Sequence, residues 1–277
     1  QVFAIKGRPL LDPLIVHVPD LATLAQVAVP DPRLAAVAAL WPGPLTVVLR
    51  RQAGVPDLVT AGKDTVAVRL PSHPVFREVL RLAGRPLAAP SANPFGYVSP
   101  TRAAHVVASL GARCPWVVDG GPCEHGVEST ILDLSVPGRA RLLRPGPIPV
   151  ETLRGLLGEV EVVTRAASQH APQDAPGMLE RHYSPATKVA LFPVGSLPVV
   201  ANLRSAVVFL GRRASPPANA DVFLLSESGA VAEAAHHLFD LLRRLDGRGY
   251  ETIHVELADP AGVGAAYNDR LTRAAAR

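Results

Sequence analysis

Two short polar clusters, KGRP (6–9) and PSAN (90–93), interrupt otherwise apolar stretches of the sequence. Lys6 and Arg8 are two residues apart, so on extended backbone both side chains would project from one face. Two permanent cations on one face can bind an anion, and Ser91 and Asn93 repeat the spacing with neutral hydrogen-bonding groups. Together the clusters predict a phosphate site, although a K-x-R pair alone is more often solvated surface and P-S-A-N alone is typical of a turn.

Neither of the familiar nucleotide-binding loops is found in the sequence. A Walker A loop needs G-x-x-x-x-G-K-[ST], whereas the Gly-Lys pair at 62–63 is followed by Asp64. Gly262 and Gly264 have no third glycine at the spacing of a dinucleotide-binding G-x-G-x-x-G. A nucleotide bound by this chain is therefore expected to be held by side chains.

The composition indicates a folded protein of about two domains, because the chain has 277 residues and is 48% hydrophobic. The uncharged run at 189–203 is broken by Pro193 and Pro198 and is shorter than the roughly 18 residues of a membrane span. The only cysteines, Cys114 and Cys123, lack the spacing of zinc ligands. No targeting signal is recognised, and a reducing cytoplasm fits best.

The charge is distributed unevenly along the chain. Residues 1–150 carry 15 Lys and Arg against 10 Asp and Glu (net +5), and residues 151–277 carry 13 against 14 (net −1), which gives the total of +4. A modest excess of this kind suits a polyphosphate ligand or weak RNA contact. It is far below the clustered basic stripe of a dedicated nucleic-acid-binding protein.

The elements that must position the polar clusters alternate between short β-rich runs and helical patterns, which favours an α/β fold. Strands are expected at 14–18, 45–50, 65–70, 86–89, 116–118, 129–134 and 141–144. Helices are expected at 21–27, 32–40, 74–82, 101–110 and 150–157. The helix at 32–40 should stop at Trp41, because the two prolines of WPGP (41–44) remove backbone donors.

A linker is expected where the apolar periodicity fades, from about residue 164 to residue 187. It contains Met178, Arg181, His182 and Tyr183, which an inert linker would not need. We therefore expect it to be partly ordered and to lie across the mouth of the first domain. A small open α/β domain follows, with strands at 206–210, 221–225 and 252–256, a long helix at 230–245 and a closing helix from 261.

Seven motifs in this order resemble the YrdC-like family in its two-domain form, the L-threonylcarbamoyladenylate synthases. They are WPGPLTVVL (41–49), TVAVRLPSHP (65–74), APSANPFGYVSPT (89–101), GVESTILDL (126–134), LLRPGPI (142–148), PGMLERHYSPATKV (176–189) and GVGAAYNDRLTRAA (262–275). Family members usually begin with a further P-T-E-T-V-Y-G-L-like segment that helps to hold threonine. The printed sequence opens at Gln1, downstream of that motif, so this part of the amino-acid site is not assigned.

The resemblance implies a large, twisted, mixed sheet whose concave face carries the site, followed by a small Rossmann-like α/β domain. The expected boundaries are a catalytic YrdC-like domain at 1–160, a linker or lid at 161–187 and a C-terminal domain at 188–277. In the family, the tyrosine of H-Y-[SA]-P folds over the nucleotide, so the linker would act as a lid that excludes water.

The resemblance also implies roles for residues that match the family's motifs. The catalytic positions are Lys6, Arg8, Ser91 and Asn93. The ATP-binding positions are Arg8, Asp12, Thr65, Ser91, Asn93, Thr101, Arg144 and Tyr183. The threonine-binding positions are His17, Arg69, Ser129 and Thr130.

Several of these positions also have plainer interpretations. Asp12 stands where the family often has Asn, so it would either help to hold Mg²⁺ or simply face solvent. Arg144 alone reads as a solvated arginine at a strand end, and His17 alone as a structural histidine. Glu128 is as good a salt-bridge partner as a general base. No metal ligand is assigned.

The expected reaction joins L-threonine, bicarbonate or CO₂ and ATP, with Mg²⁺, into L-threonylcarbamoyladenylate and pyrophosphate. By resemblance the product passes to a transferase complex that modifies tRNA. Two alternatives stay open: a non-catalytic module that binds tRNA or double-stranded RNA, and a relative that carbamoylates another acceptor from carbamoyl phosphate. Few aromatic residues are available for the first. Dependence on threonine and bicarbonate would separate the second.

Overall fold

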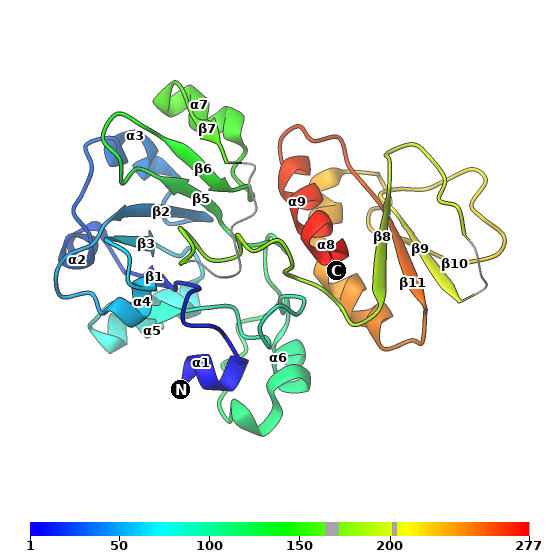
Figure 1. Cartoon of the computed structure of the whole chain (residues 1–277), viewed down its shortest axis with the longest axis horizontal. Helices are drawn as coiled ribbons and strands as arrows, with labels where there is room; N and C mark the ends of the chain where they lie inside the picture. The colour runs from blue at the N-terminus through cyan, green and yellow to red at the C-terminus, as the bar shows by residue number, and fades with distance from the viewer. Residues whose placement is uncertain (164–171, 201–203, 277) are drawn as a thin grey trace. The chain divides into compact units, whose positions relative to one another are not determined.

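A computed structural model describes residues 1–163, 172–200 and 204–276. The chain packs as two compact units, and each unit is built from segments that are far apart in the sequence (Figure 1). The large-sheet unit comprises Arg8–Ser91 and Glu128–Glu180. The small-sheet unit comprises Gln1–Gly7, Ala92–Val127 and Arg181–Arg277. The domain boundaries expected at 160 and 187 divide the chain into consecutive segments, whereas each packed unit combines segments from separate parts of the sequence. Of the expected linker, residues 164–171 lie outside the described residues.

The large-sheet unit is built on a seven-stranded sheet. Its strands are β1 (Ile15–His17), β2 (Leu45–Arg50), β3 (Thr65–Arg69), β4 (Leu87–Ala89), β5 (Thr130–Asp133), β6 (Arg141–Arg144) and β7 (Glu161–Val162). They lie in the order β4-β1-β3-β2-β5-β6-β7. The pairs β1–β3, β2–β5 and β6–β7 are parallel, and β1–β4, β2–β3 and β5–β6 are antiparallel. The mixed sheet predicted from the sequence is confirmed.

Helices cover one face of this sheet. They are α2 (Leu21–Val27), α3 (Leu34–Val37) and α7 (Val150–Leu157), and the unit also contains α4 (Asp57–Thr60), α5 (Pro74–Ala83) and the 3₁₀ helix η1 (Ala38–Leu40). Leu24, Val37 and Leu153 pack against Val47 and Val68 of the sheet in one buried cluster. Helices α2, α3 and α7 therefore do not cover the opposite face of the sheet. The alternate side chains of each strand project from that face.

The small-sheet unit contains four parallel strands in the order β10-β9-β11-β8. They are β8 (Lys188–Phe192), β9 (Ser205–Phe209), β10 (Asp221–Leu224) and β11 (Thr252–Glu256). The helices are α1 (Val2–Lys6), α6 (Ala103–Leu110), η2 (Gly111–Arg113), α8 (Val231–Asp246) and α9 (Gly264–Ala275). Leu238 and Phe239 of α8 and Leu271 of α9 pack on Val208 and Val255 of the sheet. The predicted small open α/β fold is confirmed.

Two local predictions are wrong. Lys6 ends helix α1 instead of lying on extended backbone, because Gly7 adopts the left-handed conformation (φ 64°) that terminates the helix. Lys6 and Arg8 therefore do not project from one face of a strand. The run at 116–118 is not a strand in the structure, and Trp116 is 88% exposed. The run is rich in residues that favour strands, but no strand pairs with it within the described residues, and a strand needs cross-strand partners.

No helix among the described residues is both long enough and apolar enough to cross a membrane.

Two glycines of the large-sheet unit predict opposite effects of added volume. Gly155 lies on α7, and the space that an added methyl group would occupy there is open, so Gly155→Ala should raise the free energy of unfolding by about 0.5–1 kcal/mol through a less flexible unfolded chain. A Cβ on Gly146 would lie 2.2 Å from the Thr130 nitrogen, so Gly146→Ala should lower it by about 1–3 kcal/mol. Urea unfolding of both variants tests this, and equal stabilities would contradict it.

Candidate functional site

A row of polar side chains crosses three neighbouring strands on the sheet face opposite to α2, α3 and α7. His17 of β1 is paired with Arg69 of β3, and Arg69 is paired with Thr46 of β2. Directly paired residues share one face of a sheet, so the three side chains stand side by side. Thr65 lies on the same face four residues before Arg69, because side chains alternate along a strand. Three predicted positions are thus brought onto one surface.

His17 is a buried, uncharged member of this row. Its ring packs edge-on against Phe76 of α5, with 5.0 Å between ring centroids. Burial, and then the positive charge of Arg69, lower the pKa of His17 to about 4. The imidazole is therefore neutral near pH 7, and it can exchange hydrogen bonds but cannot pair with a carboxylate as a cation. Arg69, which donates from Nε to the Gly43 carbonyl oxygen at 3.0 Å, is the cation of the row.

Ser129 extends the row through hydrogen bonds. Its Oγ lies 2.7 Å from Oγ1 of Thr46. Arg144 donates to the Ser129 carbonyl oxygen from Nε (3.1 Å) and Nη2 (2.9 Å), and from Nη2 to Oγ (3.2 Å). Arg144 is only 4% exposed, so the interpretation as a solvated arginine is wrong. Arg144 is therefore a buried residue that holds Ser129 in place through hydrogen bonds.

Thr46 is a site residue that the sequence reasoning missed. It is fully buried, its hydroxyl contacts Ser129 Oγ, and it is paired with Arg69 across the strands. The only signal in the sequence is a hydroxyl within the apolar run LTVVL (45–49). That signal has no meaning until the pairing of β2 with β3 is known.

Thr130 and Ser91 are placed differently from Ser129. The Thr130 hydroxyl donates to the Ile148 carbonyl oxygen and accepts from the Ile148 nitrogen, both at 2.9 Å. The hydroxyl therefore uses both its donor and its acceptor on the loop that follows β6, and it holds that loop in place. Ser91 is half-buried just after β4. Their roles toward threonine and ATP stay predictions.

Arg8 and Asp12 form a buried ion pair, 3.0 Å from Nη2 to Oδ2, with side chains 4% and 1% exposed. Arg8 also donates to the carbonyl oxygens of Asp12 and Pro13. Neither residue is solvated, so the expectation that Asp12 simply faces solvent is wrong. Arg8 likewise is not a surface cation.

The described residues do not fit a protein-held metal centre. They include no group of three or more His, Cys, Asp or Glu side chains placed to bind a metal ion. The Asp12 carboxylate is engaged by Arg8. Mg²⁺ commonly keeps several waters and binds through phosphate oxygens, so Mg²⁺ stays a prediction that depends on ATP.

Lys6 and Asn93 come together in the small-sheet unit. The Lys6 ammonium donates to the Asn93 carbonyl oxygen, and the Phe95 nitrogen donates to the Lys6 carbonyl oxygen at 2.8 Å. The Asn93 amide donates to the carbonyl oxygens of Pro94 (3.0 Å) and Tyr97 (2.9 Å). Two of the four predicted catalytic positions are thus directly joined.

Thr101 lies two residues before α6 in the same unit. Its nitrogen and Oγ1 lie 3.2 and 3.4 Å from Nδ1 of His105, and its carbonyl oxygen accepts from the Cys123 nitrogen at 2.9 Å. Thr101 is buried and ties the start of α6 to the loop that contains Cys123. Its role toward ATP stays a prediction.

Tyr183 belongs to the hydrophobic core of the small-sheet unit. It is 1% exposed, its ring stacks on Phe239 with 5.4 Å between centroids, and the Arg270 guanidinium lies 5.2 Å from the ring centre. In this structure the tyrosine of the expected lid is therefore packed inside a core. A movement toward a nucleotide would break these contacts, so contact with ATP stays a prediction.

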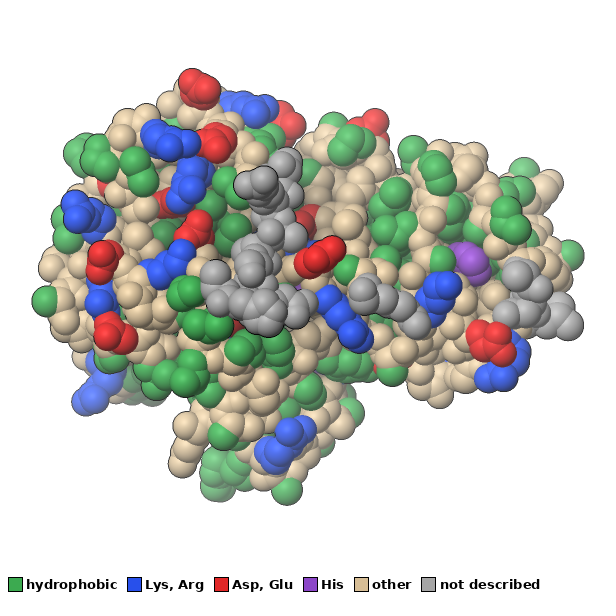
Figure 2. Space-filling model, in the orientation of Figure 1, with side chains coloured by type: hydrophobic (Ala, Val, Ile, Leu, Met, Phe, Trp, Pro, Cys, Tyr) green, Lys and Arg blue, Asp and Glu red, His purple; other side chains and the backbone are tan. Residues whose placement is uncertain are grey.

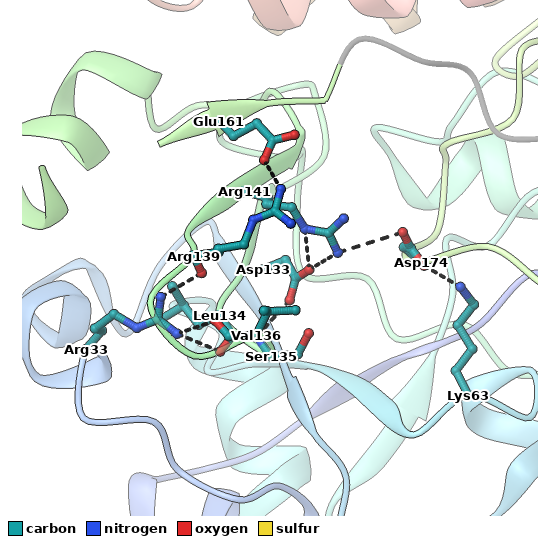
Figure 3. A network of polar contacts seen from close by, with 10 residues as sticks. All are labelled: Arg33, Lys63, Asp133, Leu134, Ser135, Val136, Arg139, Arg141, Glu161 and Asp174. Atoms are coloured by element: carbon teal, nitrogen blue, oxygen red, sulfur yellow. Dashed lines mark hydrogen bonds and ion pairs between the residues drawn. The ribbon is translucent and has the colours of Figure 1, made fainter. Parts of the chain in front are cut away.

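Another part of the expected linker, before Tyr183, covers the polar face of the large sheet. Asp174 pairs with Lys63 and, at 3.9 Å, with Arg141, which also binds Asp133 (Figure 3). Met178 is buried in a cluster with sheet residues that include Ile131. Arg144 donates from Nη1 to the Pro176 carbonyl oxygen at 3.1 Å. Residues 173–178 are thus ordered against the sheet, as expected.

The surface gives little support to a dedicated RNA-binding module. Lys and Arg side chains are interspersed with Asp and Glu on the face that Figure 2 shows. Several form surface ion pairs, such as Arg139 with Glu161 (2.7 Å) and Arg212 with Glu227 (2.7 Å). Paired charges of this kind do not make the uninterrupted basic stripe that nucleic-acid binding uses.

Comparisons with known proteins agree with this architecture. A family model described as "Telomere recombination" (Sua5, YciO and YrdC) matches residues 1–146, and one described as "Threonylcarbamoyl-AMP synthase, C-terminal domain" matches residues 148–276. The threonylcarbamoyl-AMP synthases of Pyrococcus abyssi and Bacillus subtilis are each 36% identical to the chain, which covers 83% and 82% of their lengths. The alignments include 99% of this chain.

Solved structures give the same result. The crystal structure of P. abyssi Sua5 complexed with L-threonine matches with a TM-score of 0.88 at 36% identity, covering 99% of this chain and 83% of that chain. A double variant of that protein, with a histidine and a tyrosine replaced by alanine, matches with a TM-score of 0.85. The chain belongs to the family of Sua5- and YrdC-like threonylcarbamoyl-AMP synthases.

The low pKa of His17 predicts a stability that falls in acid. With a pKa of about 4 in the folded chain and 6.5 for an ordinary histidine, only the unfolded chain binds this proton between those values. The free energy of unfolding should therefore fall as the pH drops through this window, by up to about 3 kcal/mol. His17→Gln should remove this part of the slope in urea unfolding. Parallel pH profiles for the two proteins would contradict the assignment, since other groups cancel in the difference.

The contact between Thr46 and Ser129 predicts a role for the Thr46 hydroxyl in the predicted threonine site. Thr46→Val keeps the shape but removes the hydrogen bond, so the KM for L-threonine should rise roughly five- to tenfold. Thr46→Ser should restore it. The control is Thr60→Val, because Thr60 is also buried but its Oγ1 contacts only the Asp57 carbonyl oxygen in α4 among the described contacts. Equal KM values for the two valine variants would refute the role.

Proposed function

We propose that the chain catalyses the formation of L-threonylcarbamoyladenylate from L-threonine, bicarbonate or CO₂ and ATP, with release of pyrophosphate. Family membership supports the reaction class. The observation that carries the proposal at the level of residues is the polar row of His17, Arg69 and Thr46, continued by Ser129. A cation, a neutral imidazole and hydroxyl groups on one face are the complement of a hydroxy-amino acid.

Each part of threonine has a partner of suitable chemistry in this row. Arg69 pairs with the α-carboxylate, because a guanidinium is always charged and binds carboxylate oxygens well. The hydroxyl of Ser129, held by Thr46 and Arg144, exchanges a hydrogen bond with the substrate hydroxyl. His17 is neutral near pH 7 and accepts a hydrogen bond from the substrate amine, which orients the amine without adding repulsion.

The chemistry then needs two bond-forming steps. The neutral amine nitrogen bonds to the carbon of CO₂ and loses one proton, which gives a carbamate. A carbamate oxygen attacks the α-phosphorus of ATP, and the bond from that phosphorus to the bridging oxygen of pyrophosphate breaks. Such a transfer asks for alignment and charge neutralisation more than for a protein nucleophile. Lys6 and Arg8 are our candidates for the neutralising cations.

Exclusion of water favours the product, because both the carbamate and the mixed anhydride are labile. Ala175 and Met178 of the covering segment are buried against Ile131 and Val48 of the sheet. These apolar side chains stand next to the strand that leads from Ser129. They supply a dry boundary on that side of the threonine row.

The remaining proposals concern partners and location. The product would pass to a transferase complex that modifies tRNA, with at most weak RNA contact by this chain, and the chain would act in the cytoplasm. The His-Tyr pair at 182–183 occurs once in the sequence. Because a solved variant of the P. abyssi protein replaces a histidine and a tyrosine, we propose that this pair bears on activity, with Tyr183 acting from within its core.

The proposed reaction predicts that pyrophosphate release depends on threonine and bicarbonate together. Release that is equal without threonine would overturn the proposal, and release that needs carbamoyl phosphate instead would favour the carbamoyltransferase alternative. Arg69→Ala should raise the KM for threonine roughly 10- to 100-fold, the usual loss of a charged hydrogen-bonded pair. Arg81→Ala is the matched control, because Arg81 pairs only with the exposed Glu78 on α5 among the described ion pairs, which contributes little.

A further inference from the structure

Helix α8 of the small-sheet unit holds the segment that follows Asn93 through one arginine. Arg243 donates from Nε to the Ser99 carbonyl oxygen (3.2 Å), from Nη1 to Ser109 Oγ (2.8 Å) and from Nη2 to the Val98 carbonyl oxygen. Its guanidinium carbon also lies 4.8 Å from the centre of the Tyr97 ring. One side chain of α8 therefore fixes the backbone at two consecutive residues and the ring of a third.

Tyr97 passes this restraint to Asn93. The Tyr97 hydroxyl donates to Oδ2 of Asp246, three residues after Arg243 on α8, at 2.8 Å. Burial, and then the hydrogen bond to Asp246, raise the pKa of Tyr97 to about 12, so it stays a donor at neutral pH. The Tyr97 carbonyl oxygen accepts from the Asn93 amide at 2.9 Å. Arg243 and Asp246 thus hold Tyr97 from both sides, and Tyr97 holds Asn93.

The Asn93 side chain has an unused acceptor. Two carbonyl oxygens accept from its Nδ2, so the amide orientation is fixed and Oδ1 must point the other way. Asn93 is 1% exposed, and Oδ1 has no hydrogen-bond partner within the described residues. A buried acceptor without a partner costs about 1–3 kcal/mol. A ligand that donates a hydrogen bond to Oδ1 would recover this free energy.

We propose that Arg243 is a positioning residue for the nucleotide-dependent step, acting through Tyr97 on Asn93 and on Lys6, which donates to the Asn93 carbonyl oxygen. The inference rests on the proposed function and deepens it. It assigns a function to the region after residue 187, because α8 sets the geometry of a segment that lies more than a hundred residues before it in the chain. No ligand contact by α8 is required.

Arginine suits this duty better than lysine. Its planar fork donates in several fixed directions at once, whereas the lysine ammonium is a mobile point charge. Arg244, the next residue, provides a matched control. Its side chain is 55% exposed, and its pairing with Asp240 is at 3.9 Å. Both arginines line one cavity of about 550 Å³, together with Pro94, Tyr97, His105 and Ser109. A ligand in that cavity would involve both arginines, but positioning of Asn93 involves Arg243 alone.

The test compares Arg243→Lys, Arg243→Ala and Arg244→Ala in the full chain by pyrophosphate release. For the Arg243 variants we expect kcat/KM for ATP to fall roughly tenfold or more, since small misplacement of a reacting group has effects of this size. The KM for threonine should change by less than about twofold, because the threonine row belongs to the large-sheet unit. Arg244→Ala should match the wild type.

Three outcomes would overturn the inference. The Arg243 variants could keep the wild-type kcat/KM for ATP, or they could lose as much toward threonine as toward ATP. Arg243→Ala and Arg244→Ala could also lose activity equally, which would indicate a ligand in the cavity. If Arg243→Ala does not fold in a thermal melt, Arg243→Lys and Tyr97→Phe carry the test, because each retains most of the packing. If the wild type releases no pyrophosphate with threonine, the proposed function fails. Calorimetric titration with ATP then still decides whether Arg243→Lys weakens nucleotide binding relative to Arg244→Ala.

Discussion

The pairing register of β1, β3 and β2 is the constraint on which the candidate site depends. It sets His17, Arg69 and Thr46 side by side on the face opposite to the helices. Because side chains alternate along a strand, a shift of one residue would turn this row toward the helix-covered core and expose apolar residues instead. Burial of Val47 and Val68 in that core therefore fixes which residues of the same strands project from the other face. The same strand register is required for the packing of the core and for the arrangement of the polar row.

Arginines of both units fix loops and turns through backbone hydrogen bonds, and Arg8 and Arg144 are buried while Arg243 is half-buried. Arg8, Arg144 and Arg243 each donate to backbone carbonyl oxygens of a loop or turn, so they act as internal braces. A guanidinium stays charged, and burying it without partners would be very costly. The partners are therefore supplied by the chain itself, and each brace fixes a segment that holds a predicted site residue. Arg8 and Arg144 are candidate ligand contacts in the sequence, because their charge is visible there and their partners within the chain are not.

The sequence predicts the strands and helices of both units well, since their periodicity and prolines are local signals. Through the family's motifs it also assigns candidate site residues, and two of them, His17 and Arg69, lie side by side on one face of the sheet. It cannot predict Thr46, whose meaning depends on strand pairing, nor the burial of Tyr183 against Phe239, which depends on tertiary packing. The two-residue spacing from Lys6 to Arg8 suggests a strand, whereas Gly7 ends a helix there.

Segments that lie far apart in the sequence depend on each other within the small-sheet unit. Helix α8 lies near the end of the chain, yet Gly126 packs so closely on it that a Cβ there would lie 2.2 Å from the His236 carbonyl oxygen. His236 and Asp240 of the same helix bind Glu124 and Arg102. A premature stop codon before residue 231 would therefore remove the support of the segment at 92–127. Within the small-sheet unit, a truncation of that kind would leave the sequence of this segment intact and still deprive it of the surface on which it packs.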